Sequence, residues 1–96
     1  MSDMASALAI RRLTLVAGVL TPCVAPVTVR GLTVGNGSAG DVLIYTTNDV
    51  TTDHYLIVQA GYERPLELTH DAMWRAGDTA CWLYSASGGL VILFWS

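Results

Sequence analysis

The sequence predicts an all-β protein, folded as a compact antiparallel β-sandwich or small barrel of about seven or eight short strands. Apolar and polar residues alternate over short runs, which is the spacing of half-buried strands. Turn-forming residues recur about every ten positions along the chain. The chain ends in an unbroken run of large apolar residues, 90–95. Because no internal repeat or linker is present, residues 1–96 are expected to form one domain with an N-terminal arm over residues 1–9.

Residues 79–96 are expected to form a β-hairpin at the centre of the fold. Its arms are residues 80–84 and 90–95, and its turn is residues 85–89, which include two glycines. In the second arm Leu90, Ile92 and Phe94 face one way, and Val91, Leu93 and Trp95 face the other. A strand that is apolar on both faces must be covered on both. We expect one cover to be the chain's own second sheet and the other to be a second copy or another protein.

The first half of the chain should contain three further strands. The N-terminal arm is expected to be extended or to form a short helical turn, and to be held in place by a partner. Residues 18–26 hold a glycine and two prolines, which favours a loop or an edge crossing. The apolar pattern shifts phase at Arg30 and Gly31, which predicts a bulge there. Strands are expected over residues 8–16, 27–34 and 41–47, with residues 35–40 as a connector.

The second half should alternate short strands with turns. Residues 66–69 alternate apolar and polar, which suits an edge strand where Pro65 is tolerated. Residues 70–76 fit either one helical turn or a short strand. The remaining expected segments are a polar loop over residues 48–54, a strand over 55–60 and a turn over 61–64.

The composition indicates that subunits bury apolar surface between them. The chain is 52% hydrophobic and 14% charged, it has no lysine, and its mean hydropathy is +0.45. A small soluble monomer has a large surface to cover with polar groups. We therefore expect a homo-oligomer, a dimer or a trimer. The alternative is a tightly packed monomer whose surface consists of Thr, Ser and Gly.

The charge pattern argues against nucleic-acid and membrane partners. Five arginines in a chain of net charge −3 form no basic stripe, so no nucleic-acid partner is expected. Arg11 and Arg12 are adjacent, and we weigh a place on a partner surface against solvated strand positions. They precede the apolar residues 13–25 in the order of a signal peptide. Pro22 and Pro26 interrupt that run, and it is shorter than the roughly 20 residues of a membrane helix, so no membrane partner is expected.

Four motifs are weighed as sites and set aside, so that no enzyme, cofactor or metal is expected. Residues 35–40 match GxGxxG, but the segment opens onto a strand and not onto a helix. A zinc site needs three or four converging ligands, and no spacing forces the two Asp-His neighbours together. The carboxylates of Glu63 and Glu67 are expected to be solvated, and there is no GxSxG. The two Asp-His neighbours are Asp53 with His54 and His70 with Asp71.

The cysteines and the aromatic residues are assigned structural roles. Cys23 and Cys81 lack CxxC spacing, and two free thiols are favoured over a single disulfide. Trp82 and Phe94 are expected to fill the core. Trp74 and Trp95 lie near segment ends, where an amphipathic ring suits a subunit interface. With Arg11 and Arg12 they form the predicted interface set, and a sugar-stacking platform built on the same rings is the alternative.

From residue 27 onward the order of these features resembles a family of small β-sandwich virion proteins of tailed bacteriophages. The resemblance lies in the strand and Asn/Gly turn of VRGLTVGNGSAGDVLIYTT, in AGYERPLEL, in the Trp before the Gly-Asp turn of MWRAGDTACWLYS, and in the last strand GGLVILFWS. Gly40 and residues 58–61 match the family's loop glycine and its Leu-x-x-Gly run. Residues 1–26 have no counterpart.

The resemblance implies a structural role in a virion. Members of this shape are head decoration (cement) proteins or small tail and fibre modules. We therefore expect a capsid decoration protein that stabilises the phage head, is made in the host cytoplasm, and lies on the capsid surface against the major capsid protein. The alternative is a tail or fibre module that binds a host-surface glycan.

Overall fold

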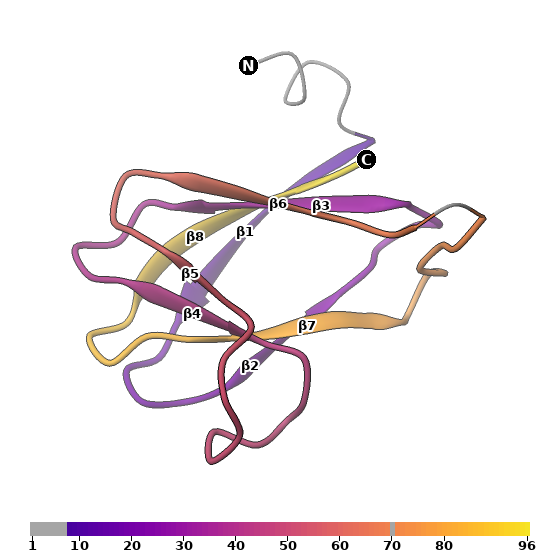
Figure 1. The fold of residues 1–96 in the computed structure, drawn as a ribbon. Helices are drawn as coiled ribbons and strands as arrows, with labels where there is room; N and C mark the ends of the chain where they lie inside the picture. Colours follow the sequence, from indigo (N-terminus) through magenta and orange to yellow (C-terminus); the bar gives the residue numbers. More distant parts are fainter. Residues whose placement is uncertain (1–7, 70) are drawn as a thin grey trace.

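The protein is an all-β sandwich, as predicted. The computed structural model describes residues 8–69 and 71–96, which form two antiparallel sheets of four strands each (Figure 1). No helix occurs in these ranges, so none has the length and hydropathy needed to cross a bilayer. Most of the predicted N-terminal arm, residues 1–7, lies outside the described residues.

Each sheet interleaves early and late strands. The first sheet has the order β1-β8-β3-β6, and the second has the order β2-β7-β4-β5. Every pair of neighbours is antiparallel. The strands are β1 (Ala9–Leu15), β2 (Thr21–Val24), β3 (Gly31–Asn36), β4 (Val42–Tyr45), β5 (Leu56–Val58), β6 (Glu63–Glu67), β7 (Thr79–Tyr84) and β8 (Gly89–Trp95).

The last two strands do not form the predicted hairpin. β7 lies in the second sheet between β2 and β4, whereas β8 lies in the first sheet between β1 and β3. The segment between them therefore crosses from one sheet to the other. Each of the two strands has a hydrogen-bonded neighbour on both edges and is therefore a central strand of its own sheet. The prediction that residues 79–96 organise the fold is confirmed in another form, because they supply a central strand of both sheets.

Gly88 makes the crossing between the sheets possible. Its φ is +72°, and an added Cβ would lie 2.8 Å from the carbonyl oxygen of Leu15 and 2.9 Å from the amide nitrogen of Ala17. Its own amide donates a hydrogen bond to Oγ of Ser85. Backbone atoms cannot swing aside as a side-chain tip can. Only glycine fits both the φ and the space here.

Gly88→Ala is expected to lower the free energy of unfolding by about 2–4 kcal/mol, because backbone strain and the steric clash add. Gly77 is the matched control, since its φ is +93° but an added Cβ would meet nothing within 4 Å. Gly77→Ala therefore carries the strain alone. Urea unfolding curves of both variants test the difference. Equal losses of unfolding free energy would show that the clash of the new Cβ with the backbone of Leu15 and Ala17 adds nothing to the backbone strain.

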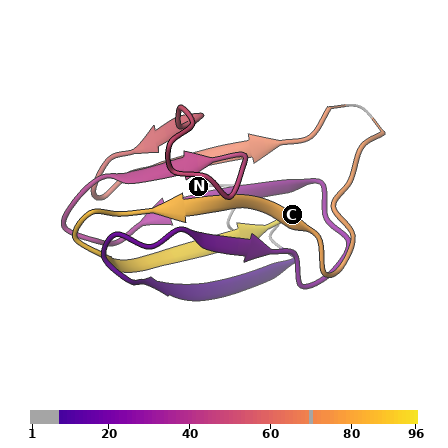
Figure 2. The same cartoon turned by 90° about the horizontal axis from the view of Figure 1, so that it is seen from below.

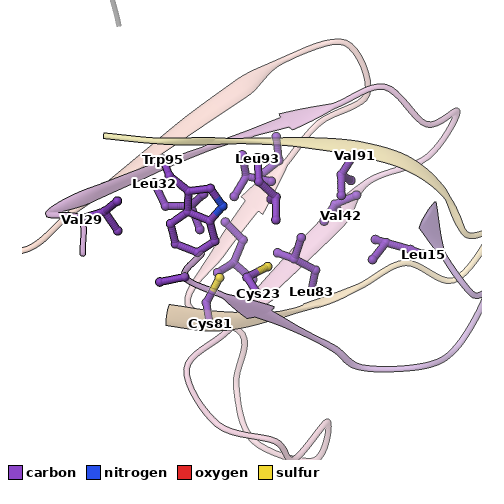
Figure 3. Close-up of a cluster of buried hydrophobic side chains, with 14 residues drawn as sticks. Leu15, Cys23, Val29, Leu32, Val42, Cys81, Leu83, Val91, Leu93 and Trp95 are labelled. Carbon is purple, nitrogen blue, oxygen red and sulfur yellow. The ribbon is translucent and has the colours of Figure 1, made fainter. Parts of the chain in front are cut away.

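The core lies between the inner faces of the two sheets (Figure 3). Val91, Leu93 and Trp95 of β8 point into it, and this alternation confirms the predicted division of that strand into two faces. Trp95 is 0% exposed, and its ring meets that of Trp74 edge-on at 6.3 Å. The other buried members of the cluster are Leu15, Cys23, Ala25, Val29, Leu32, Val34, Val42, Ile44, Val58, Cys81 and Leu83.

The prediction that Trp82 and Phe94 fill the core is wrong for Trp82, whereas Phe94 is buried at 7% exposure but lies outside the cluster between the sheets. Trp82 pairs with Pro22 on one side and with Tyr45 on the other, and it points away from the interior. Phe94 points outward from β8, so the core cluster does not include it. Because β7 and β8 are apolar on both faces, the alternation of their side chains divides each strand into two faces. It does not indicate which of the two faces the interior of the sandwich.

Several predicted boundaries also differ from the structure. The loop expected over residues 18–26 contains β2, which is an edge strand despite Pro22. The strand expected from residue 27 begins at Gly31, because Val29 makes only an isolated bridge to Trp74. Segment 70–76 holds that bridge and no helical turn among its described residues, His70 lying outside them.

Asn36, the last residue of β3, connects the two sheets. Its buried amide nitrogen donates to the carbonyl oxygens of Gly40 and of Val58 in β5, each at 2.8 Å. Its Oδ1 accepts hydrogen bonds from the amide and the hydroxyl of Ser38. The segment predicted as a connector over residues 35–40 therefore joins strands of different sheets, and its residue Asn36 is part of the packed interior.

Candidate assembly surfaces

The structure does not bring the four predicted interface residues together. Arg11 and Arg12 are exposed on β1, an edge strand of the first sheet. Trp74 is half-buried. Trp95 is enclosed by the chain's own core, so its side chain offers no surface to a partner.

The outer face of the first sheet carries an apolar row along β8. Leu90 and Ile92 are half-buried, and Phe94 is only 7% exposed. The register places Ile10 of β1 beside Phe94, and Gly35 of β3 beside Ile92. An added Cβ on Gly35 would lie 3.3 Å from the Phe94 ring, so the missing side chain makes room for that ring. The outer face of an antiparallel sandwich is usually polar, so this row is a candidate contact surface through the half-buried Leu90 and Ile92 and the exposed Ile10 beside them, whereas Phe94 is buried beneath it.

The outer face of the second sheet is also apolar, and it is richer in rings. The Tyr45 ring meets Tyr84 edge-on at 6.4 Å and His54 at 6.3 Å. Trp82 lies beside Tyr45 in the register, and no charged residue occupies a paired position on this face. The remaining outward side chains of these pairs are Pro22, Leu43 and Ile57.

All four sheet edges carry features that oppose the addition of another strand. In the second sheet β2 contains Pro22 and a shift of register after Cys23, and β5 is three residues long. In the first sheet β6 contains Pro65. Arg11 of β1 pairs with Leu93, so a charged residue occupies the inward-facing side of that edge. Contacts with other molecules are therefore expected through side chains and not through shared sheet hydrogen bonds.

A hollow of about 310 Å³ opens between the two sheets beside β6. Ile44 and Cys81 of the second sheet and Leu66 of the first line it, together with Trp74. Glu67 of β6 adds a carboxylate. The hollow is thus apolar within and acidic where β6 borders it.

Cys23 and Cys81 lie opposite each other in the β2–β7 register, and both are buried, free thiols. A hydrogen bond with Cys81, together with burial, raises the pKa of Cys23. A raised pKa in the folded state adds stability below the ordinary thiol value of about 8.5, and this stability is lost as the pH rises above that value.

We expect the native protein to resist alkylation by iodoacetamide, because the thiolate is the reactive form. Both cysteines should react once urea unfolds the chain. Mass spectrometry before and after unfolding measures this. Rapid labelling of the folded protein at pH 7 would contradict the buried thiol pair.

The residues weighed for metal binding and catalysis form no such site in the described ranges. No group of three or more His, Cys, Asp or Glu side chains is arranged there to hold a metal ion. Asp53 and His54 are exposed in the β4–β5 loop. In the same loop, hydrogen bonds from the hydroxyl and the amide of Thr51 lower the pKa of Asp49.

The structure therefore provides two apolar outer faces, a hollow beside β6, and two edge strands, β1 and β6, that carry exposed charged residues. Comparison with known proteins assigns no family, because no family model and no curated protein matches the chain.

Proposed function

We propose that this chain is a structural virion protein, a capsid decoration protein that lies on the major capsid protein of a tailed phage and stabilises the head. The observation that carries the proposal is the apolar row of Leu90, Ile92 and Phe94 on the outer face of the first sheet. An outer face of this kind suits a protein whose working state is packed against others. The sequence resemblance to phage virion proteins supplies the setting.

The energetics suit a repeated lattice. Burial of apolar surface contributes roughly 25 cal/mol per Å². One small contact of this kind is weak, but contacts repeated over a lattice add through avidity. Each copy offers two apolar faces and a hollow, so it can touch more than one neighbour.

Immunogold labelling tests the proposal. Antibodies against the recombinant chain are applied to virions induced from the strain that carries the gene, and purified by density gradient. We expect regular labelling over the heads and a mass-spectrometric copy number in proportion to the major capsid protein. Virions that lack the chain would refute the proposal.

Labelling confined to the tail would favour a second function, a tail or fibre module that binds a host-surface glycan. The rings of Tyr45, Trp82 and Tyr84 on one outer face favour it, because aromatic faces suit stacking against sugars. In that case Trp82→Ala is expected to abolish adsorption of the chain to host cells while leaving the fold intact.

A further inference from the structure

The charged residues are divided between the two halves of the chain. Residues 8–40 hold three arginines and no carboxylate, whereas residues 41–96 hold seven carboxylates and two arginines. The fold separates part of this charge in space, because Arg11 and Arg12 lie on β1, whereas Glu63 and Glu67 lie on β6. Two arginines lie near these carboxylates: Arg64 is exposed between them on β6, and Arg30 lines another hollow with Glu67. β1 and β2 form one long side of the sandwich, and β5 and β6 form the opposite side (Figure 2). We call these the basic side and the acidic side.

The basic side also carries exposed apolar side chains. Arg11 and Arg12 are exposed there, and no described carboxylate pairs with them. Exposed apolar side chains surround the arginines, and they come from both strands and the connection between them. These side chains are Leu8, Ile10, Val16, Val19 and Val24.

The acidic side has the complementary character. Glu63 and Glu67 are exposed on β6, at the edge of the first sheet opposite to β1. The apolar hollow opens beside Glu67, with Trp74 and Leu66 in its lining. One side of the molecule thus offers arginines among apolar side chains, and the other offers carboxylates beside an apolar hollow.

We propose that the occupant of the acidic side is a second copy of this chain, joined head to tail. Arg11 and Arg12 of one copy meet Glu63 and Glu67 of the next, and apolar side chains of the basic side fill the hollow. This inference rests on the proposed structural role and deepens it, because it names the lateral partner. A contact between two different patches of one chain generates a ring when the rotation closes.

The topology is compatible with this arrangement. In the order β1-β8-β3-β6 all neighbours are antiparallel, so β6 runs opposite to β1. Copies placed side by side in one orientation therefore bring β6 next to an antiparallel β1. Pro65 and Arg11 interrupt strand addition at these edges, so side chains make the contact. A two-fold pairing of β1 with β1 is disfavoured, because it would bring the arginines of the two copies together.

Charge reversal on each side tests the proposal. Arg11→Glu/Arg12→Glu makes both sides acidic, and Glu63→Arg/Glu67→Arg makes both sides basic. All four side chains are exposed, so the fold should survive, which circular dichroism checks. Light scattering over a concentration series should show an oligomer for the wild type. Each double variant should raise the dissociation constant of the oligomer by about tenfold or more, because it places like charges opposite each other at the interface.

Mixing, together with a variant that carries all four changes, distinguishes the head-to-tail contact from a β1-with-β1 pairing. In an equimolar mixture of the two double variants each acidic edge meets a basic edge of the other variant, so the mixture should assemble again. The variant that carries all four changes should also assemble alone. Arg75→Glu is the control for charge reversal, because it also replaces an exposed arginine by a carboxylate, but in segment 71–78 at one end of the sandwich (Figure 2). It should leave the mass of the oligomer unchanged.

Three results would overturn the proposal: a wild type that stays monomeric, reversals with no more effect than Arg75→Glu, or a mixture that fails to assemble. The failure of the proposed function is distinguishable from these. A monomer in solution that labels virion heads would refute the head-to-tail contact alone. An oligomer that responds to charge reversal as described but is absent from virions would refute the decoration role alone.

Discussion

Trp95→Ala is expected to remove about 3–5 kcal/mol from the free energy of unfolding, a large share of the roughly 5–15 kcal/mol of a typical domain. Trp95 is the largest fully buried side chain, and it packs against Trp74 in the space between the sheets. Removing the indole leaves a cavity that two paired sheets cannot close. Equilibrium unfolding in urea measures the loss, and the variant should begin to unfold at the lowest urea concentrations.

Two further variants show where the loss comes from. Nε1 of Trp95 is buried without a hydrogen-bond partner. Trp95→Phe removes that unpaired group along with part of the ring, so it should cost far less than Trp95→Ala. Trp82→Ala removes an equal volume from the outer face, where the ring is half-buried, and should cost less than half as much. Equal losses for Trp82→Ala and Trp95→Ala would contradict the assignment of Trp95 to the core.

Asn36→Asp is the second substitution with a large expected effect, although it changes the side chain's shape very little. The amide nitrogen of Asn36 donates to the carbonyl oxygens of Gly40 and Val58. A carboxylate cannot donate, so it would face two carbonyl oxygens in a buried site. An uncompensated buried charge costs about 3–5 kcal/mol. Unfolding curves at pH 7.5 should show this loss relative to the wild type.

The pH dependence of this variant has a definite sign. Burial and the two carbonyl oxygens favour the protonated form, so the pKa of the new carboxyl is higher in the folded than in the unfolded state. Stability relative to the wild type should then recover as the pH falls toward the ordinary Asp value of about 4. Asn48→Asp, at an exposed position in the β4–β5 loop, makes the same charge change and should cost little at either pH. A loss in Asn36→Asp that does not vary with pH would contradict the buried-charge explanation.

The fold class could be predicted from the sequence because alternation and turn residues are local signals. Alternation predicted correctly that Val91, Leu93 and Trp95 share a face, and Pro65 marked an edge strand. Which strands pair is decided by long-range packing. The separation of β7 from β8 therefore had no signal in the chain, since a turn with two glycines suits a hairpin and a crossing equally well.

The candidate surfaces were less accessible to sequence reasoning. Exposed arginines at positions 11 and 12 were anticipated as one of two alternatives, but Trp95 was assigned to an interface and lies in the core. Asn36 was missed as a structural residue, although a signal existed: it continues the inward phase of Leu32 and Val34. A polar residue in an apolar phase indicates a buried hydrogen-bonding group.

The place of β7 and β8 in the two sheets has a consequence for biosynthesis. Until residues 79–96 leave the ribosome, β1 and β2 lack the partners that join them to the rest of their sheets. A nascent chain of this hydropathy therefore has neither sheet complete before that point, and its apolar segments are open to aggregation or to chaperones during that time. A stall or nonsense codon before residue 79 is thus expected to release a chain in which neither sheet can be completed.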